Sequence, residues 1–327
     1  MTGVLDLLLA GLTVGLALVA VMVKSSFRAV SAFVGLGLWL ALCWVRLGAD
    51  DVALTEAAVG GGVTGLILIR AGARLDRAPP GPVTRPLQVL AALVAVLFAA
   101  GLAACVLLLP DPAPSLAPEV ARLLPDSGFG NPVTAVLMVY RPMDTLLETV
   151  VLLLALVGIW SLSSDAAFGG APAPLWDTPP RGASVFLARL LPPLGLVIGL
   201  HIFWTGADHP GGKFQGGALL AAMWLLALLA GRVREPVTAS RWVRISVLAG
   251  PLVFTLMGLA GLGWAGAFLA YPVAWTKPLV LAVEFASVLS VAASLALMVL
   301  GPARLRPQSP ASTGQSRGDD AWGERYP

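Results

Sequence analysis

The sequence predicts an all-α integral membrane protein of about nine transmembrane helices. Only 12% of its 327 residues are charged, whereas 57% are hydrophobic. Soluble domains carry about 25% charged residues, because charged side chains cover much of a water-facing surface. The apolar residues also gather in nine uncharged runs separated by polar segments. These features exclude a soluble domain and a disordered chain, and two cysteines are too few for a disulfide scaffold.

The nine runs follow one another along the chain, and a membrane helix needs about 20 mostly apolar residues. The runs cover residues 7–23, 29–45, 57–69, 86–110, 149–164, 190–207, 214–231, 245–276 and 285–303. The third, fifth and ninth runs are too short unless their helices begin before Glu56, Glu148 and Glu284. Those three helices are therefore expected to carry a carboxyl group into the membrane.

The eighth run is longer than one membrane span. Its end, about residues 262–276, contains two tryptophans and a tyrosine, Trp264, Tyr271 and Trp275. Such rings favour the level of the lipid headgroups. We therefore expect a re-entrant or interfacial segment there.

Basic residues are divided unevenly between the two sides that nine helices define. Of the 21 lysines and arginines, only five fall on one side, and these are Arg46, Arg122, Arg141, Lys213 and Lys277. Because cytoplasmic loops are richer in basic residues, we expect a multi-pass protein of the cell inner membrane with its C-terminus in the cytoplasm and its N-terminus outside. Residues 1–6 lack the basic start of a signal peptide, so the first run is expected to remain as a helix. The net charge of +3 then reflects orientation rather than a nucleic-acid partner.

Two segments rich in Pro and Gly divide the chain into modules. We expect four helices in residues 1–110, an outer linker and one helix in 111–164, a cytoplasmic linker at 165–181 and a four-helix domain at 182–301. The polar end, 302–327, is rich in Ser, Pro and Gly and is expected to be a disordered cytoplasmic tail.

The three membrane acids are the strongest functional candidates, because an ionisable side chain in hydrocarbon is costly unless it faces a partner or water. Glu56 precedes small residues that let another helix approach closely. The alternative for Glu56 is a side chain that reaches the membrane interface. All three helices run in the same direction, so Glu56, Glu148 and Glu284 should lie in the outer half of the membrane. This placement suits a water-filled vestibule that opens outward.

Polar residues accompany Glu148 on its helix. Arg141, Asp144 and Glu148 share one helix face with Thr145. An aspartate near the start of a helix also interacts favourably with the helix dipole, so initiation of the helix and an ion pathway both remain open for Asp144. We expect Lys24 or Arg141 to supply the counter-charge.

The sixth run contains His201, which follows a pair of prolines in the same run. A histidine titrates near neutral pH, and the prolines free backbone carbonyl groups. His201 is therefore a candidate for the ion pathway, and a structural histidine is the alternative.

The strongest local motif is GADHPGGKFQGG at residues 206–217. Its glycines allow a tight, non-helical turn, which is tolerated at membrane depth only where it is buried in protein or lines water. The candidate residues are Asp208, His209, Pro210, Gly211, Gly212, Lys213, Phe214, Gly216 and Gly217, with Gln215. The spacing does not fit a phosphate loop, and no His or Cys cluster completes a metal site. We expect no metal or other cofactor, and we expect Cys43 and Cys105 to be buried apolar residues.

Three stretches resemble the multisubunit Mrp-type sodium/proton antiporters and the related membrane module of membrane-bound hydrogenases. VKSSFRAVSAFVGLGLWL and GADDVALTEAAVGGGVT resemble the MbhD-type piece, which corresponds to part of the C-terminal extension of MrpA, the large Mrp protein. NPVTAVLMVYRPMDTLLETVVLLLALVGIWSL resembles the MbhE-type piece that follows it. HIFWTGADHPGGKFQGGALLAAMWLLALLAG resembles proteins of the MrpB or MnhB type from the same complexes. The resemblance covers most of residues 1–300.

The chain departs from the family pattern in the loop. The pattern has a His and an Asn where this chain has Ala207 and Asp208, and a glycine where it has Lys213. His209 therefore does not take over the role of the family histidine.

The resemblance implies an integral subunit of a cation/proton antiporter complex, whose partners are the other antiporter subunits and whose transported substrates are sodium ions and protons. Each of the three acids would bind either a sodium ion or a proton. Because a carboxylate cannot bind both at once, it would couple sodium movement to proton movement. Three alternatives remain: an equivalent subunit of a redox-driven, hydrogenase-like complex, a structural linker between larger subunits, and an intramembrane enzyme. The last has no nucleophile and base at usable spacing.

Overall fold

The computed structural model describes residues 2–75, 84–110, 112–174 and 182–305. Within these ranges helices form the fold, and the bridged pair Pro172 and Ala303 lies outside any strand. Eight helices are long and apolar enough to cross a membrane, and a further apolar helix, α10, is shorter. The prediction of an all-α membrane protein with about nine spans is confirmed.

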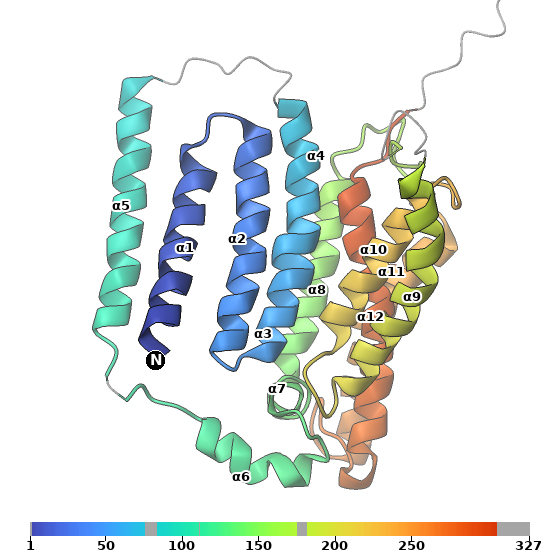
Figure 1. Cartoon of the computed structure of the whole chain (residues 1–327). Coiled ribbons are helices and arrows are strands. Elements are labelled where there is room, and N and C mark those ends of the chain that lie inside the picture. The colour runs from blue at the N-terminus through green and yellow to red at the C-terminus, as the bar shows by residue number, and fades with distance from the viewer. Residues whose placement is uncertain (1, 76–83, 111, 175–181, 306–327) are drawn as a thin grey trace, which may run out of the picture.

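The N-terminal helices stand in a row, as Figure 1 shows. They are α1 (Thr2–Met22), α2 (Ser26–Arg46) and a third span composed of α3 (Asp50–Thr55), the π-helix η1 (Glu56–Thr64) and α4 (Gly65–Leu75). Glycines bring α2 and η1 close together, because a Cβ added to Gly37 would lie 3.1 Å from the Gly61 backbone. The third span therefore packs tightly against α2, although a π-helix interrupts it.

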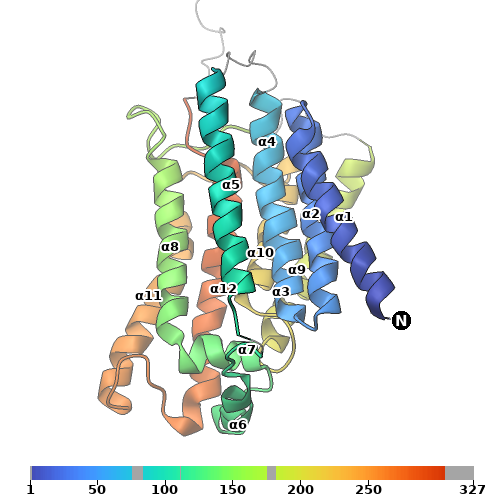
Figure 2. The same ribbon diagram turned by 90° about the vertical axis from the view of Figure 1, so that its left-hand side faces the viewer.

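The helix α5 (Arg85–Leu107) stands at the edge of the molecule (Figures 1 and 2). It has no buried residue. Cys105 on this helix is exposed and Cys43 is half-buried, so the expectation that both are buried was wrong. The reason is that apolar membrane helices can face lipid, where an apolar side chain needs no protein around it.

The middle of the chain contains a broken helix. Its elements are α7 (Pro132–Ala135), the π-helix η2 (Val136–Tyr140) and α8 (Pro142–Trp160), and the separate helix α6 (Ala117–Ser127) precedes them. The break lies at Arg141, whose φ of −133° and ψ of 48° are not helical. The buried Thr145 hydroxyl donates to the Leu137 carbonyl at 2.6 Å and so satisfies a carbonyl next to the break.

The C-terminal part is a four-helix bundle of α9 (Ala183–Thr205), α10 (Lys213–Leu229), α11 (Arg241–Trp264) and α12 (Thr276–Leu300). α12 is the central helix and packs against α8, α10 and α11. Its buried positions include Ser287, Ser290 and Ser294, whose small side chains allow close packing. The Ser290 hydroxyl donates to the Val247 carbonyl of α11 at 2.5 Å.

The eighth apolar run ends in a loop that folds back onto α11. α11 ends at Trp264, and the loop leads into the short helix η3 (Val273–Trp275). The Leu269 amide donates to the Gly258 carbonyl at 3.2 Å, and the Trp264 indole donates to the Ala270 carbonyl at 3.1 Å. The loop thus returns by more than one turn of α11 without forming a further long helix.

The second linker is held in place as far as the structure describes it. The Thr238 and Ala239 amides donate to the Gly170 and Gly169 carbonyls at 3.0 and 2.9 Å. Ala303 bridges Pro172, so the first residues after α12 are ordered where a disordered tail was expected. Residues 175–181 of the linker and 306–327 of the tail lie outside the described residues.

Candidate functional site

Lys213 is a buried cation at the start of α10. Only 4% of the residue is exposed, and its Nζ has no hydrogen-bond partner among the described residues. Gly211 and Gly212 precede it with φ of 151° and 135°, in the region that favours glycine. This turn ends the loop and directs the Lys213 side chain into the protein interior instead of toward the protein surface.

Two of the predicted acids share the cavity with Lys213. The Glu148 Oε2 of α8 lies 3.9 Å from Lys213 Nζ. Glu284 of α12 is buried at 4% exposure, and its Oε2 has no hydrogen-bond partner among the described residues. The rings of Phe214 and Phe254 lie 4.9 and 6.0 Å from Lys213 Nζ, where their faces attract a cation.

The cavity has a volume of about 240 Å³ and is bordered by four parts of the chain. Its lining comes from α3, from the broken helix with α8, from the loop and α10, and from α12. The polar lining residues are Asp51, Thr55, Thr134, Thr145, Glu148, Lys213, Gln215 and Glu284. Two of these polar groups, Lys213 Nζ and Glu284 Oε2, have no hydrogen-bond partner among the described residues, so the cavity offers room for water molecules or a small ion.

The loop before Lys213 is held by the segment that leads into α7. The Gly130 and Asn131 amides both donate to the Ala207 carbonyl at 3.1 Å. The Thr134 hydroxyl donates to the Gly206 carbonyl at 2.6 Å, and Asn131 Nδ2 donates to the His209 carbonyl at 3.0 Å. These bonds satisfy backbone groups of the non-helical loop inside the protein.

Asp51 joins the N-terminal helices to the same loop. Its carboxylate accepts from the Gly211 amide at 3.0 Å and from Asn131 Nδ2 at 3.3 Å. Gln215 Nε2 donates to the Thr55 hydroxyl at 2.9 Å. Sequence reasoning missed Asp51 and Asn131 as contacts, because each bonds residues that are distant along the chain. Asn131 before a proline, a typical helix start, was the only local signal.

Asp208 fixes the loop at its exposed side. Its carboxylate accepts two hydrogen bonds from Lys277 Nζ at 2.8 and 2.9 Å and one from the Gly130 amide at 3.0 Å. The Lys277 ammonium, aided by the Gly130 amide, holds the pKa of Asp208 below its usual value. The ionised Asp208 therefore ties the loop to the start of α12 and does not line the cavity.

The predicted counter-charges do not face Glu148 or Glu284. Arg141 Nη2 lies 2.6 Å from the Asp144 carboxylate, and both side chains are exposed. Lys24 follows α1 at the opposite end of the bundle from these acids. Lys213 is the cation beside Glu148, because the glycine turn directs it inward.

The other predicted residues lie outside the cavity or at its wall. Glu56 is half-buried at the start of η1, and its carboxyl group lies against Gly37 and Gly60 instead of the cavity. Thr145 lines the cavity, whereas His201 and His209 are exposed and do not.

The remaining motif residues shape the loop and the start of α10. Pro210 is exposed, and Phe214 is half-buried. Gly216 and Gly217 permit close packing, because an added Cβ would lie 2.7 Å from the Gly199 carbonyl oxygen or from the Val291 side chain. The glycines thus bring α10 against α9 and α12.

Two protein families match parts of the chain. Residues 11–77 match the MbhD family, which is described as one of the subunits of MBH. Residues 183–303 match the family described as a domain related to the MnhB subunit of a Na⁺/H⁺ antiporter.

Relatives from two organisms match shorter regions. An uncharacterized protein of Methanocaldococcus jannaschii is 28% identical over 154 residues, which are 42% of this chain and 59% of the relative. A Staphylococcus aureus protein named as antiporter subunit mnhB2 is 29% identical over 86 residues, which are 26% of this chain and 61% of that protein. The chain therefore spans about 60% of the length of these relatives.

Two solved structures share the fold. A chain of an Mrp complex from Dietzia sp. DQ12-45-1b aligns with a TM-score of 0.71 and 27% identity, over 93% of this chain and 35% of that chain. A chain of the membrane-bound sulfane sulfur reductase, an archaeal respiratory membrane complex, aligns with a TM-score of 0.51 and 23% identity, over 65% of this chain and 97% of that chain. The second likeness concerns the fold alone.

Proposed function

Because the chain joins an MbhD region at residues 11–77 to an MnhB-related region at 183–303, we propose that it is an integral subunit of a multisubunit sodium/proton antiporter complex. Its partners are the other subunits of an Mrp-type complex, and its substrates are sodium ions and protons. The role requires no cofactor and no covalent chemistry. The alignment of 93% of the chain with part of an Mrp complex supports this assignment.

One observation carries the role in ion movement: Lys213 lies beside Glu148 in a cavity that Glu284 also lines. One ammonium and two carboxylates together carry one net negative charge. Lys213 and Glu284 are buried, whereas the Glu148 side chain is 50% exposed and gives the group contact with its surroundings. Because an unbalanced charge among buried groups is costly, one proton or one sodium ion neutralises the group, but not both at once. Release of one ion is thereby coupled to binding of the other.

Glu56, whose carboxyl group lies against α2, binds the ions in a separate step of the same pathway. All three acids lie near the beginnings of helices that run in the same direction. Since most basic residues of the described ranges gather at the other end of the bundle, we place the C-terminus in the cytoplasm, the N-terminus outside and the cavity in the outer half of the membrane.

The experiment measures sodium/proton exchange by the complete complex reconstituted into liposomes. Glu148→Gln and Glu284→Gln remove one charge each and are expected to lower exchange by at least about tenfold per assembled complex. Lys213→Met leaves two carboxylates without their cation and is expected to slow exchange to a similar extent. Glu119→Gln, which removes an exposed acid on α6, is the matched control and should exchange as the native complex does.

Complex recovery separates this function from a structural role. If Glu148→Gln and Glu284→Gln lower the yield of complex but leave exchange per complex unchanged, the acids only hold the complex together and the ion role is wrong. Copurification of nickel–iron or iron–sulfur proteins from the native membrane would instead assign the chain to a redox-driven complex.

A further inference from the structure

A second cavity, of about 460 Å³, lies at the opposite end of the bundle from Lys213. It opens between α8 and α11, beneath the loop that follows α8. Its volume is in the range of small-molecule sites, which is about 300–1,000 Å³. None of its lining residues belongs to the cavity of Glu148 and Glu284.

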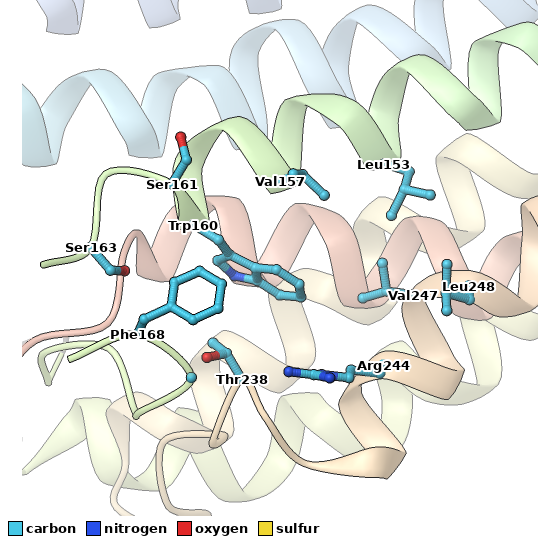
Figure 3. A pocket seen from close by; sticks show the side chains of 11 residues that line it. Leu153, Val157, Trp160, Ser161, Ser163, Phe168, Thr238, Arg244, Val247 and Leu248 are labelled. Atoms are coloured by element: carbon cyan, nitrogen blue, oxygen red, sulfur yellow. The ribbon is translucent and has the colours of Figure 1, made fainter. Parts of the chain in front are cut away.

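The walls of this cavity are apolar and come from two helices and a loop. Leu153, Val157 and Trp160 project from α8, Val247 and Leu248 from α11, and Phe168 from the loop. Figure 3 shows the Trp160 indole across the middle of the pocket, with Phe168 and Val247 to either side. Such walls suit a hydrocarbon chain.

Besides three hydroxyl side chains, the indole N–H of Trp160 and the exposed residue Arg244 add polar groups to the lining of the apolar cavity. The Trp160 Nε1 is buried and has no hydrogen-bond partner among the described residues. Arg244 lines the cavity (Figure 3), and its guanidinium forms no ion pair within the described part of the chain. An unsatisfied buried indole N–H and a nearby cation together call for an acceptor that carries negative charge.

The position of the cavity indicates which kind of negatively charged group it binds. It lies where α8 ends and α11 begins, at the end of the bundle where most basic residues of the described chain gather. Tryptophan favours the headgroup level of the membrane, and basic pockets between membrane helices bind anionic headgroups. We propose that this cavity binds one anionic phospholipid, with the phosphate at Arg244 and the Trp160 indole N–H and one acyl chain between α8 and α11.

The site is independent of ion transport, so it can be tested on the purified full chain in detergent. Native mass spectrometry counts bound dioleoyl phosphatidylglycerol and, at matched concentration, dioleoyl phosphatidylcholine. Both lipids carry the phosphate, but the choline cation of phosphatidylcholine cancels the net charge that attracts Arg244. Because attraction of an anionic lipid contributes about 1 kcal/mol per basic residue, phosphatidylglycerol should bind about fivefold more tightly than phosphatidylcholine. Inorganic phosphate at the same concentration should not displace it, because phosphate lacks the acyl chain.

Variants separate the headgroup contact from the chain contact. Arg244→Gln should abolish the preference for phosphatidylglycerol, whereas Arg241→Gln should retain it, because Arg241 stacks on Trp242 and does not line the cavity. Val157→Phe should lower the binding of both lipids by filling the apolar space. Equal effects of Arg244→Gln and Arg241→Gln, displacement by inorganic phosphate alone, or unchanged lipid binding in Val157→Phe would each overturn the proposal.

Discussion

Lys213 determines the charge balance of the cavity that it shares with Glu148 and Glu284. A buried ammonium group costs several kcal/mol unless charges and dipoles compensate for it. Glu148 and the faces of Phe214 and Phe254 provide that compensation. Among Lys213, Glu148 and Glu284, a single negative charge then remains to be neutralised.

The contribution of Asp208 to the stability of the folded chain depends on pH. Lys277 lowers its pKa below the unfolded value of about 3.9. Its stabilising contribution is therefore fully present above about pH 4 and is lost as the pH falls through the lowered folded value. We expect Asp208→Asn to lower the thermal midpoint of the purified chain by the same amount from pH 5 to pH 8, and by less near pH 3.

The control for this measurement is Asp126→Asn, which removes an exposed carboxylate on α6. It should shift the midpoint little at every pH, since a single exposed charge contributes less than about 1 kcal/mol. A difference between the native chain and Asp208→Asn that grows between pH 5 and pH 8 would contradict the ionised, lysine-bonded state.

At the scale of elements, the junction of α9 and α10 depends on a close backbone approach at Gly206. A Cβ added there would lie 2.6 Å from the Gly212 nitrogen and 2.7 Å from its Cα. Because backbone atoms cannot move aside as a side chain does, Gly206→Ala is expected to open the loop and destabilise the protein by about 2 kcal/mol. The thermal midpoint of the purified chain measures this.

Gly158→Ala on α8 is the matched substitution for Gly206→Ala. An added Cβ at Gly158 meets nothing within 4 Å, and alanine favours a helix more than glycine does. Its midpoint should equal or exceed that of the native chain. A midpoint for Gly206→Ala as high as that of Gly158→Ala would show that the loop is looser than its contacts indicate.

The spans were predictable from the sequence, whereas their interruptions were not. Apolar runs determine membrane helices because the hydrocarbon core demands about 20 apolar residues. The π-helices η1 and η2 and the break at Arg141 are absent from that pattern, since they depend on contacts such as the Thr145 bond to Leu137. π-Helices occur often at functional sites. Here η2 contributes Leu137 and Met138 to the cavity wall, and η1 directly follows Thr55 of the wall.

The site was predictable in its acids and not in its geometry. The cost of charge in hydrocarbon singled out Glu56, Glu148 and Glu284, of which Glu148 and Glu284 line the cavity and Glu56 does not. The roles of Asp51 and Asn131 and the inward direction of Lys213 depend on the loop before α10. Three distant segments hold this loop: α3, residues 130–134 and the start of α12. Spacing along one sequence contains no information on which distant segments meet.

At the scale of the whole molecule, opposite ends of the bundle hold cavities of different polarity. The end near Lys213 holds a polar cavity, and the end near Arg244 holds an apolar one. The helix α5 has no buried residue, so the described chain leaves a full apolar helix for lipid or other subunits to cover. Because the two cavities lie at opposite ends, the orientation of the chain in the membrane determines from which side ions reach the polar cavity and which leaflet faces the apolar one.

The orientation is tested with single cysteines at the two ends. In a chain whose Cys43 and Cys105 are replaced by serine, Asp126→Cys lies on α6 and Asp165→Cys on the loop after α8, at opposite ends of the bundle (Figure 1). Both positions are exposed. Because basic residues favour the cytoplasmic side, a membrane-impermeant maleimide should label Asp126→Cys in intact cells and should label Asp165→Cys only after the cells are opened. Labelling in the reverse order would place the acids of the cavity in the inner half of the membrane, so protons and sodium ions would reach them from the cytoplasm.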